Sequence, residues 1–417
     1  MITWANMRAS SAPWLILPVM IYAYLYIDDA TFTAPSMYGV ESGELASHAL
    51  AIVVPGVATC AAWEAGRHRL LQPLARTGQR GAVRQFLRAA TPVLVLMLVL
   101  VAGTMAMARR AVGVWPAGAG WLAVAHLVVL CIGWTISGWS LGLLMPRSIA
   151  APLCGIGCWA WLAMTHAMAA PWIRHLGGFI DGNSTVNDLL DPIVYFVPWA
   201  VIAGVALSLS ILARMRPRGW AALIAVALLT FTVIAGRSAV LGWGYGNPHH
   251  PRLVSLTCTG KEPRVCVPPE YGPYVTQLSN NIKEPIARLH KAGLPAPEEM
   301  RITSGDLALR AGTWPLNWSL PPLGGQEGPS EFALGIAESA VTGTAIRAGV
   351  KDCRQQGSPA AAWAALVAGV KESEMRQMMS PSDWAALQKI RRLPVSEQTQ
   401  WFTHSVVRQQ HCAKGMP

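Results

Sequence analysis

The sequence predicts an α-helical polytopic membrane protein of about seven transmembrane helices, followed by a mostly helical α+β domain. Three observations support this fold class. Of the 417 residues, 53% are hydrophobic and only 13% are charged, whereas an ordinary soluble domain carries about 25% charged residues. Apolar stretches of near-bilayer length recur through the first 240 residues. No lysine precedes Lys261, and the chain after it has a mixed, ordinary composition.

Spanning the hydrocarbon core takes about 20 mostly apolar residues. We expect seven spans, in chain order Ala12–Ile27, Ala46–Trp63, Ala90–Ala108, Trp121–Leu144, Ile149–Trp172, Ile193–Leu212 and Gly219–Gly236. The first has no small-residue cleavage motif behind it and should be a retained helix. The predicted domains are therefore a transmembrane domain over 1–240, a Gly-, Pro- and His-rich juxtamembrane linker over 241–257, and a further domain over 258–417.

Arginine placement predicts the orientation, because cytoplasmic loops are enriched in basic residues. The predicted inner segments hold Arg8, six arginines between residues 67 and 88, Arg147, and Arg214, Arg216 and Arg218. The opposite loops hold Asp28, Asp29, Glu41, Glu44, Asp181, Asp188 and Asp191, with Arg109, Arg110 and Arg174 as exceptions. We expect a multi-pass protein of the cytoplasmic membrane with its N-terminus in the cytoplasm and its C-terminal domain outside.

The eight cysteines agree with this topology. Four lie within predicted spans as small packing residues: Cys60, Cys131, Cys154 and Cys158. The other four lie in the C-terminal domain, and disulfides persist outside the cytoplasm. We expect the pairs Cys258–Cys266, around a short loop, and Cys353–Cys412, although four cysteines allow three pairings and a zinc site is the rival interpretation.

The C-terminal domain should contain more helix than strand. A strand is expected near Val265–Val267, a helix over Tyr274–Ala292 and one or two strands within Arg301–Trp318. Four further helices follow: one at Phe332–Val350, two that begin after Ser358 and Ser380, each with proline next, and one that begins near Ser396. We expect the tryptophans 314, 318, 363, 384 and 401 to fill a core, and Glu331 and Glu338 to form a solvated helix stripe.

The sequence lacks the common motifs of nucleotide-binding and hydrolytic sites. The chain has no GxxxxGK[ST], HExxH or GxSxG sequence, so we predict that it is not an enzyme and needs no cofactor. No carboxylate is expected deep in a span, and His126 and His166 are interpreted as packed, hydrogen-bonded residues. His249 and His250 are interpreted as a solvated linker pair, and no metal site is predicted. The arginines of the inner loops explain the basic balance without nucleic acid.

The segment "EAGRHRLLQPLARTGQRGAVRQFLR", residues 64–88, is the candidate functional site. Arg76, Arg80, Arg84 and Arg88 recur every four residues and would form one stripe on a helix. The loop is much longer than a tight helical hairpin requires. Composition alone favours a role in topology and contact with anionic lipid, and the alternative is a docking element for a cytoplasmic protein.

This segment resembles the cytoplasmic loop between the second and third spans of ABC-2-type permeases. In that family a glutamate and a nearby glycine lead a short helix that rests on the nucleotide-binding subunit. The matching residues here are Glu64, Gly66, Arg67, Leu70, Leu71, Pro73, Arg76 and Arg80. The resemblance covers about residues 1–215, and it implies a re-entrant or interfacial helix pair within Pro171–Asp191. It also implies a cytoplasmic ABC ATPase partner and a homodimer or heterodimer of permease chains.

Two functions remain open from the sequence. The first is the permease subunit of an ABC-type exporter that works with a separate ATPase. The alternative is a membrane-anchored extracytoplasmic binding or sensor protein without transport activity.

Overall fold

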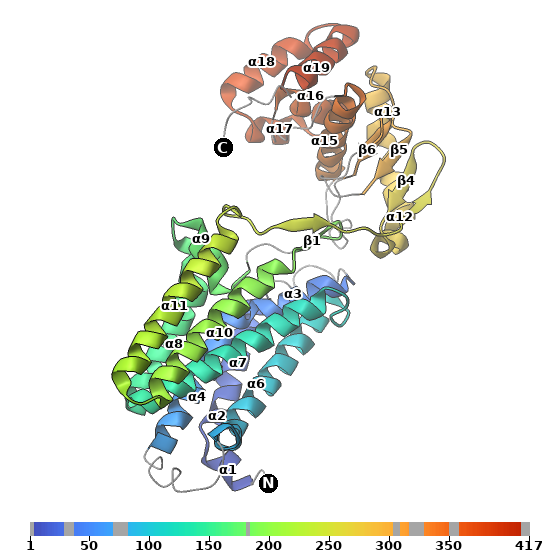
Figure 1. Ribbon diagram of the computed structural model, residues 1–417. Coiled ribbons are helices and arrows are strands. Elements are labelled where there is room, and N and C mark those ends of the chain that lie inside the picture. Colours follow the sequence, from blue (N-terminus) through green and yellow to red (C-terminus); the bar gives the residue numbers. More distant parts are fainter. Residues whose placement is uncertain are drawn as a thin grey trace. The chain divides into compact units, whose positions relative to one another are not determined.

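The computed structural model describes residues 4–28, 37–69, 82–180, 184–302, 309–316, 329–349 and 358–409. These residues divide into two compact units, Met1–His250 and Pro251–Pro417. The boundary lies inside the linker that the sequence predicts at 241–257. Each unit is described by itself below (Figure 1).

The first unit is a bundle of apolar helices (Figure 1). Its helices are α1 (Trp4–Ala9), α2 (Ala12–Asp28), α3 (Gly39–His48), α4 (Leu50–Arg69), α6 (Ala82–Val112), α7 (Gly120–Leu144), α8 (Arg147–Ala163), α9 (Pro171–Gly177), α10 (Ile193–Arg214) and α11 (Arg218–Val240). A 3₁₀ turn, η2 (Met164–Ala167), follows α8, and the short strands β1 (Asp188–Leu190) and β2 (His249–Pro251) pair with each other. Helix α4 packs against α7, α8, α6 and α2, so it is the central helix of the bundle.

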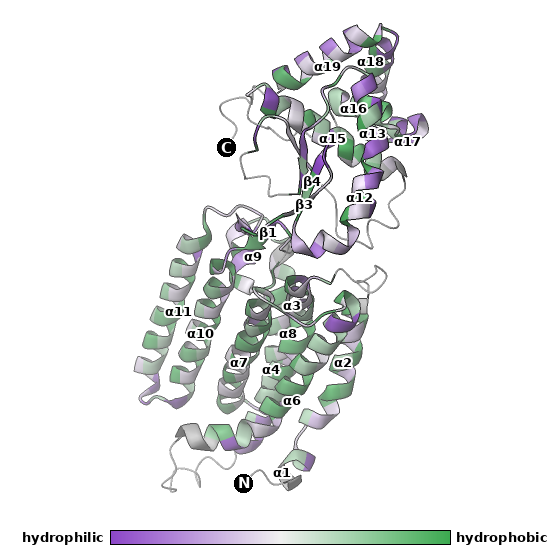
Figure 2. Ribbon diagram, turned by 90° about the vertical axis from the view of Figure 1, so that its right-hand side faces the viewer, coloured by the Kyte–Doolittle hydropathy of each residue, from purple (hydrophilic) through white to green (hydrophobic). Residues whose placement is uncertain are grey.

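Four described helices are long and apolar enough to cross a membrane: Phe86–Val112, Gly120–Leu144, Ile193–Arg214 and Arg218–Val240. A fifth crossing is possible if α3 and α4 form one span, since they are continuous apart from a 47° bend. Figure 2 shows that the long helices of this unit are hydrophobic along most of their length. The apolar composition is that of a membrane protein, as the sequence predicts.

The predicted span Ile149–Trp172 is wrong in its second half. Helix α8 ends at Ala163, and after the turn η2 the chain begins a new helix at Pro171. Pro171 is the first residue of the new helix, a position where its missing amide hydrogen costs no hydrogen bond within the helix. The 17 residues of α8 measure about 25 Å, somewhat less than the hydrocarbon core.

The helix pair expected within Pro171–Asp191 is also wrong. The described residues there form one short helix, α9, followed by the strand β1. Gly178 ends α9 in the left-handed conformation, with φ of 91°, which only glycine adopts without steric cost. Residues 184–190 then fold back through two hydrogen bonds, from the Leu190 amide to Ser184 Oγ and from the Thr185 amide to Asp188 O.

Glycines let the bundle pack with its helix backbones in contact. A Cβ on Gly43 of α3 would lie 2.0 Å from the carbonyl oxygen of Gly120, where α7 begins. A Cβ on Gly138 or Gly142 of α7 would lie 2.5 or 2.3 Å from carbonyl oxygens of α4. Small residues at helix contacts are typical of membrane bundles, where close packing replaces the hydrophobic effect as the driving force.

The second unit combines a four-stranded sheet with helices. Strand order is β3 (Thr257–Thr259), β4 (Arg264–Val267), β5 (Glu299–Arg301) and β6 (Thr313–Pro315); β3 is antiparallel to β4, and the other two pairs are parallel. Its helices are η3 (Pro269–Tyr274), α12 (Val275–Asn281), α13 (Lys283–Lys291), α15 (Pro329–Arg347), α16 (Pro359–Ala368), α17 (Glu372–Met378), α18 (Pro381–Arg391) and α19 (Val395–Gln409). The sheet and helices form the α+β arrangement that the sequence predicts.

Local sequence signals explain several elements of this unit. Ser358 and Ser380 cap α16 and α18, because their hydroxyls accept hydrogen bonds from the amides of Ala361 and Asp383. The predicted helix over 274–292 is divided at Ile282 into α12 and α13.

Two of the five predicted core tryptophans are buried. The Trp314 ring packs against Gly343 of α15, so closely that a Cβ on this glycine would lie 1.9 Å from the ring. Trp363 packs on Phe402 with ring centroids 5.0 Å apart. Trp384 and Trp401 are partly exposed, and Trp318 lies outside the described residues. The core of this unit therefore depends on tryptophan at two positions, one on the sheet and one on α16.

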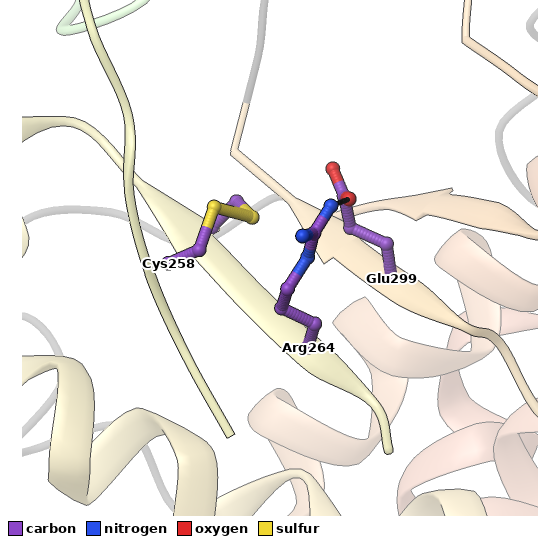
Figure 3. Close-up of a disulfide and its surroundings, with 4 residues drawn as sticks. Cys258, Arg264 and Glu299 are labelled. Carbon is purple, nitrogen blue, oxygen red and sulfur yellow. Dashed lines mark hydrogen bonds and ion pairs between the residues drawn. A yellow bond between two sulfur atoms is a disulfide. The ribbon is translucent and has the colours of Figure 1, made fainter. Parts of the chain in front are cut away.

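The disulfide Cys258–Cys266 is present and joins facing residues of β3 and β4 (Figure 3). On the other side of β4, Arg264 forms an ion pair with Glu299 of β5, as Figure 3 shows. The bridge and the ion pair therefore link three consecutive strands. The predicted pair Cys353–Cys412 lies outside the described residues, and the four cysteines of the helical unit are free and buried, as expected of packing residues.

Candidate functional site

The end of α4 carries the described residues of the predicted docking motif. Helix α4 does not stop at the apolar boundary near Trp63 but continues to Arg69. Glu64, Gly66 and Arg67 therefore lie on the last turns of a rigid helix, immediately before residues 70–81. Leu70, Leu71, Pro73, Arg76 and Arg80 lie outside the described residues.

Glu64 is buried and accepts hydrogen bonds from the segment that connects α1 to α2. Its Oε1 accepts hydrogen bonds from the Ser11 amide at 2.8 Å, the Ser11 hydroxyl at 2.9 Å and the Ser10 hydroxyl at 3.2 Å. Ser10 and Ser11 connect α1 to α2, so one carboxylate oxygen satisfies donors at the start of a helix, where amides have no partner within the helix. The N-terminus of α2 also carries the positive end of the helix dipole, which favours the negative charge of Glu64 at this position.

Arg67 completes this cluster. Its guanidinium donates to Glu64 Oε2 at 3.1 Å and to the carbonyl oxygen of Ala9, the last residue of α1. About 38% of the arginine side chain is exposed, whereas the Glu64 side chain is 5% exposed. Arg67 is thus the member of the pair that remains accessible to another molecule.

A second set of contacts joins the same turn of α4 to α8. A Cβ on Gly66 would lie 2.5 Å from Cβ of Arg147, the first residue of α8, so glycine permits this close approach. The Arg147 guanidinium lies over the Trp63 ring, 4.7 Å from its centroid, a cation–π distance. We define the Glu64 junction as these residues together: Ser10, Ser11, Trp63, Glu64, Gly66, Arg67 and Arg147.

The start of α6 meets α7 close to the same end of α4. Phe86 packs edge-on against Trp139 with centroids 5.2 Å apart, and His68 of α4 lies 5.7 Å from the same indole. The chain therefore enters residues 70–81 from one packed helix and leaves them into another. Arg84 and Arg88, the end of the predicted arginine stripe, belong to the first turns of α6, and Arg88 is exposed.

His126 is a buried structural histidine, as the sequence predicts. The Trp199 indole donates to its Nδ1 at 2.8 Å, so Nε2 carries the hydrogen and donates to the carbonyl oxygen of Gly178 at 2.6 Å. Tyr195 packs edge-on against the imidazole at 5.3 Å. Both ring nitrogens are satisfied, so the residue links α7, α9 and α10. The side chain of His166 lies outside the described set.

Glu44 is a residue that the sequence interpretation misplaced. Glu41 and Glu44 were expected in an outer loop, but both belong to α3, and Glu44 is buried. Its Oε2 accepts from the Ser184 amide at 2.9 Å, and its Oε1 has no hydrogen-bond partner among the described residues. The spacing of Gly39 and Gly43, four residues apart, is the signal that could have identified a packed helix here.

The second unit offers an open groove of about 540 Å³ between the end of α13 and one face of α19. Its lining includes Lys291, Gly293, Ser396, Thr399, Thr403 and His404.

Glu338, on α15, is half-buried, and burial raises the pKa of its carboxyl above the ordinary value. The side chain of Glu331 lies outside the described set, so the solvated stripe expected of these two acids stays a prediction.

Within the described ranges, no group of three or more His, Cys, Asp or Glu side chains is placed to hold a metal ion. His249 and His250 are exposed on β2, and His249 Nδ1 lies 2.8 Å from the carbonyl oxygen of Asn247.

Comparison with known proteins gives one match. A family model described as "Domain of unknown function (DUF7224)" matches residues 265–412, which lie in the second unit. Neither a curated protein nor a solved structure matches the chain. The match therefore relates the second unit to a family and leaves the helical unit to be interpreted from its own geometry.

Proposed function

We propose that this chain is the membrane-spanning permease subunit of an ABC-type exporter and that it works with a separate cytoplasmic ATPase. The observation that carries the proposal is the Glu64 junction. It fixes the start of the arginine-rich loop to the N-terminal helices through Glu64 and to α8 through Gly66 and Arg147. A loop that only set topology would need positive charge but no such attachment.

The junction gives a route by which force on the loop would reach the bundle. A partner that pushes on residues 70–81 would act on the last turn of α4. Because Glu64 is hydrogen-bonded to Ser10 and Ser11, the α1–α2 connection would move with that turn. Because α4 is the central helix, packed on α7 and α8, the displacement would be transmitted across the unit. A buried polar cluster of this kind moves as one piece, since separating its members leaves unpaired polar groups.

The topology we propose has seven crossings. The four long apolar helices and the α3–α4 pair account for five, and α2 and α8, each 17 residues long, would account for the others. The N-terminus and residues 70–81 would then face the cytoplasm, and the second unit, with its disulfide, would lie outside. A second permease chain, identical or different, would complete the pathway, and anionic lipid would contact the arginines of the inner loops.

The test uses Leu71 of the proposed docking segment, because Glu64 is internal. Full-length tagged protein is purified in mild detergent from its native membranes, and the ATP hydrolysis that copurifies is measured. We expect wild type to carry this activity and Leu71→Asp to lose most of it, since a charge at an apolar anchor lowers affinity by about tenfold or more. The matched control is Leu253→Asp, because Leu253 is 86% exposed in the second unit.

Equal ATP hydrolysis in the Leu71→Asp and Leu253→Asp preparations would reject docking at this segment. Arg67→Lys tests the accessible member of the junction, since lysine keeps the charge but lacks the planar fork with which arginine reaches Glu64 and Ala9 together.

The second candidate function is an extracytoplasmic binding or sensor protein anchored by the helical unit. Two observations favour it: the family match is confined to the second unit, and that unit carries the α13–α19 groove. A wild-type preparation without any copurifying ATP hydrolysis would move the conclusion to this function.

A further inference from the structure

Two arginines, one on each flank of α9, each lie over an aromatic ring. The guanidinium of Arg237, in the last turn of α11, lies 5.4 Å from the centroid of Trp172. The guanidinium of Arg174, on α9, lies 5.6 Å from the centroid of Tyr245, in the segment that follows α11. Trp172 and Arg174 are two residues apart, so they point to opposite flanks of the helix. We refer to Arg174 and Arg237 as the α9 arginine pair.

The surrounding contacts fix the position of this pair. A Cβ on Gly236, next to Arg237, would lie 2.9 Å from Cδ2 of Leu176, so α9 packs directly on α11. The Tyr245 hydroxyl donates to the carbonyl oxygen of Ala169 at 2.9 Å. His175 of α9 binds the segment after α11 through a hydrogen bond of 3.0 Å to the carbonyl oxygen of Gly244. The pair is therefore held on a packed platform rather than on free loops.

The depth of the platform corresponds to a membrane–water boundary. It lies at the end of the bundle where α11 stops and α10 begins, opposite the Glu64 junction (Figure 1). Trp172 and Trp243 pack against Leu176 and Val240 with their indoles partly exposed. Tryptophan and tyrosine concentrate at the level of lipid headgroups, so a membrane surface at this end of the bundle would bring lipid phosphates level with the two guanidinium groups.

The chemistry of Arg237 leaves it ready to bind an anion. Its side chain is exposed, and among the described residues it forms no ion pair with a carboxylate. The Trp172 ring covers one face of the guanidinium, which leaves the N–H groups at its edge free to donate in the plane. A phosphate oxygen pair matches that edge and accepts two parallel hydrogen bonds.

Topology does not account for these arginines. They lie at the end that the orientation argument assigns to the outside, where arginine is disfavoured. The same arrangement recurs at Arg109, which also lies at this end and over an aromatic ring, 4.7 Å from the Trp115 centroid. Stacking is not confined to this end, since Arg147 lies over Trp63 at the other end; what distinguishes this end is positive charge that the orientation rule leaves unexplained.

We propose that the α9 arginine pair binds anionic phospholipid in the adjacent leaflet, with Arg237 donating to the phosphate and Arg174 adding positive charge on the other flank of α9. The ligands hold α9 and the segment 243–247 at the membrane surface, and this segment leads into the second unit. The proposal does not depend on transport activity, so it stands or falls separately from the ATPase partner.

The experiment measures lipid binding to the full-length protein in neutral detergent. Phosphatidylglycerol, phosphatidylcholine and inorganic phosphate are titrated separately, and bound lipid is counted by native mass spectrometry. Wild type should bind phosphatidylglycerol more tightly than phosphatidylcholine. Arg174→Ala with Arg237→Ala should weaken phosphatidylglycerol binding by about tenfold. The charge-matched control is Arg110→Ala with Arg392→Ala, two exposed arginines with no ring partner in the described chain, and it should bind as wild type does.

Arg174→Lys with Arg237→Lys distinguishes specific binding from net charge. Lysine keeps the charge without the planar fork, so binding should fall by a few-fold, and this variant also decides the matter if the alanine variant fails to fold. Equal phosphatidylglycerol binding by wild type and the lysine and alanine variants would overturn the proposal. So would displacement of the lipid by millimolar inorganic phosphate, because the site would then be a phosphate site rather than a headgroup site.

Discussion

Glu64 illustrates how one side chain can match a motif and yet have a role inside the chain. The sequence marks it as the first residue of a docking segment, and the structure buries it against Ser10 and Ser11. Replacing Glu64 by alanine would leave these donors unpaired, at a cost of about 1–3 kcal/mol. Loss of partner binding in that variant would thus report on helix packing as well as on docking.

At the same scale, Glu338 predicts a pH dependence for the second unit. Burial raises the pKa of this carboxyl in the folded state, so the folded state holds its proton more tightly than the unfolded state. The stabilisation that comes from this tighter proton binding is fully present below the pKa of Glu338 in the unfolded state. It is lost as the pH rises through the pKa of Glu338 in the folded state. We therefore expect Glu338→Gln to unfold at a higher temperature than wild type at neutral pH, and the two to converge at acidic pH. Thermal unfolding measured from acidic to neutral pH checks the prediction. A difference in unfolding temperature between the two proteins that does not change with pH would contradict it.

At the scale of elements, the contact of α3 with α7 rests on Gly43. A Cβ there would lie 2.0 Å from a backbone oxygen, which no rotamer change can relieve. We expect Gly43→Ala to destabilise the helical unit by about 2–3 kcal/mol, as overpacking of a tight contact does. Gly157→Ala is the matched control, because a Cβ at Gly157 of α8 meets nothing within 4 Å, and alanine there favours the helix. The measurement is unfolding in detergent, and an equal response of both variants would refute the assignment.

Elements with a local signal were predictable from the sequence, and elements that depend on contacts were not. Ser358 and Ser380 each precede a proline, and both helices begin where this pattern places them. Hydrophobic runs located the long helices in the same way, because burial in lipid requires only composition.

The errors arose where a helix is defined by its neighbours. The helix α3 carries Glu41 and Glu44, two charges that suggest a loop, yet it is helical because Gly39 and Gly43 seat it on the start of α7. The Glu64 junction joins residues more than 50 positions apart, a pairing that no local pattern in one sequence contains. Glutamate and glycine were recognisable there only through the family resemblance, which indicates the segment but not its internal partners.

At the scale of the whole molecule, the two units differ in what stabilises them. The helical unit relies on apolar helices in backbone contact, and its four cysteines stay reduced and buried. The second unit has a disulfide across β3 and β4 and ion pairs on its surface, such as Arg391 with Glu372. A disulfide suits an oxidising compartment, so the composition of each unit agrees with a chain that crosses a membrane before its second unit begins.

That argument leads to a prediction about topology. If α2 and α8 both cross the membrane along with the other five, the N-terminus and the second unit lie on opposite sides; if only one of them crosses, they lie on the same side. We expect a reporter that is active only in the cytoplasm to be active when fused within residues 70–81 and inactive when fused after residue 409. Activity at both positions would mean that α8 does not cross, because both fusion positions follow α2 in the chain and only α8 of the two 17-residue helices lies between them. A thiol-labelling experiment tests α8 directly, because a single cysteine placed at Met168, after α8 and the turn η2, should react only from the outer side when α8 spans the bilayer and from the cytoplasmic side when it does not.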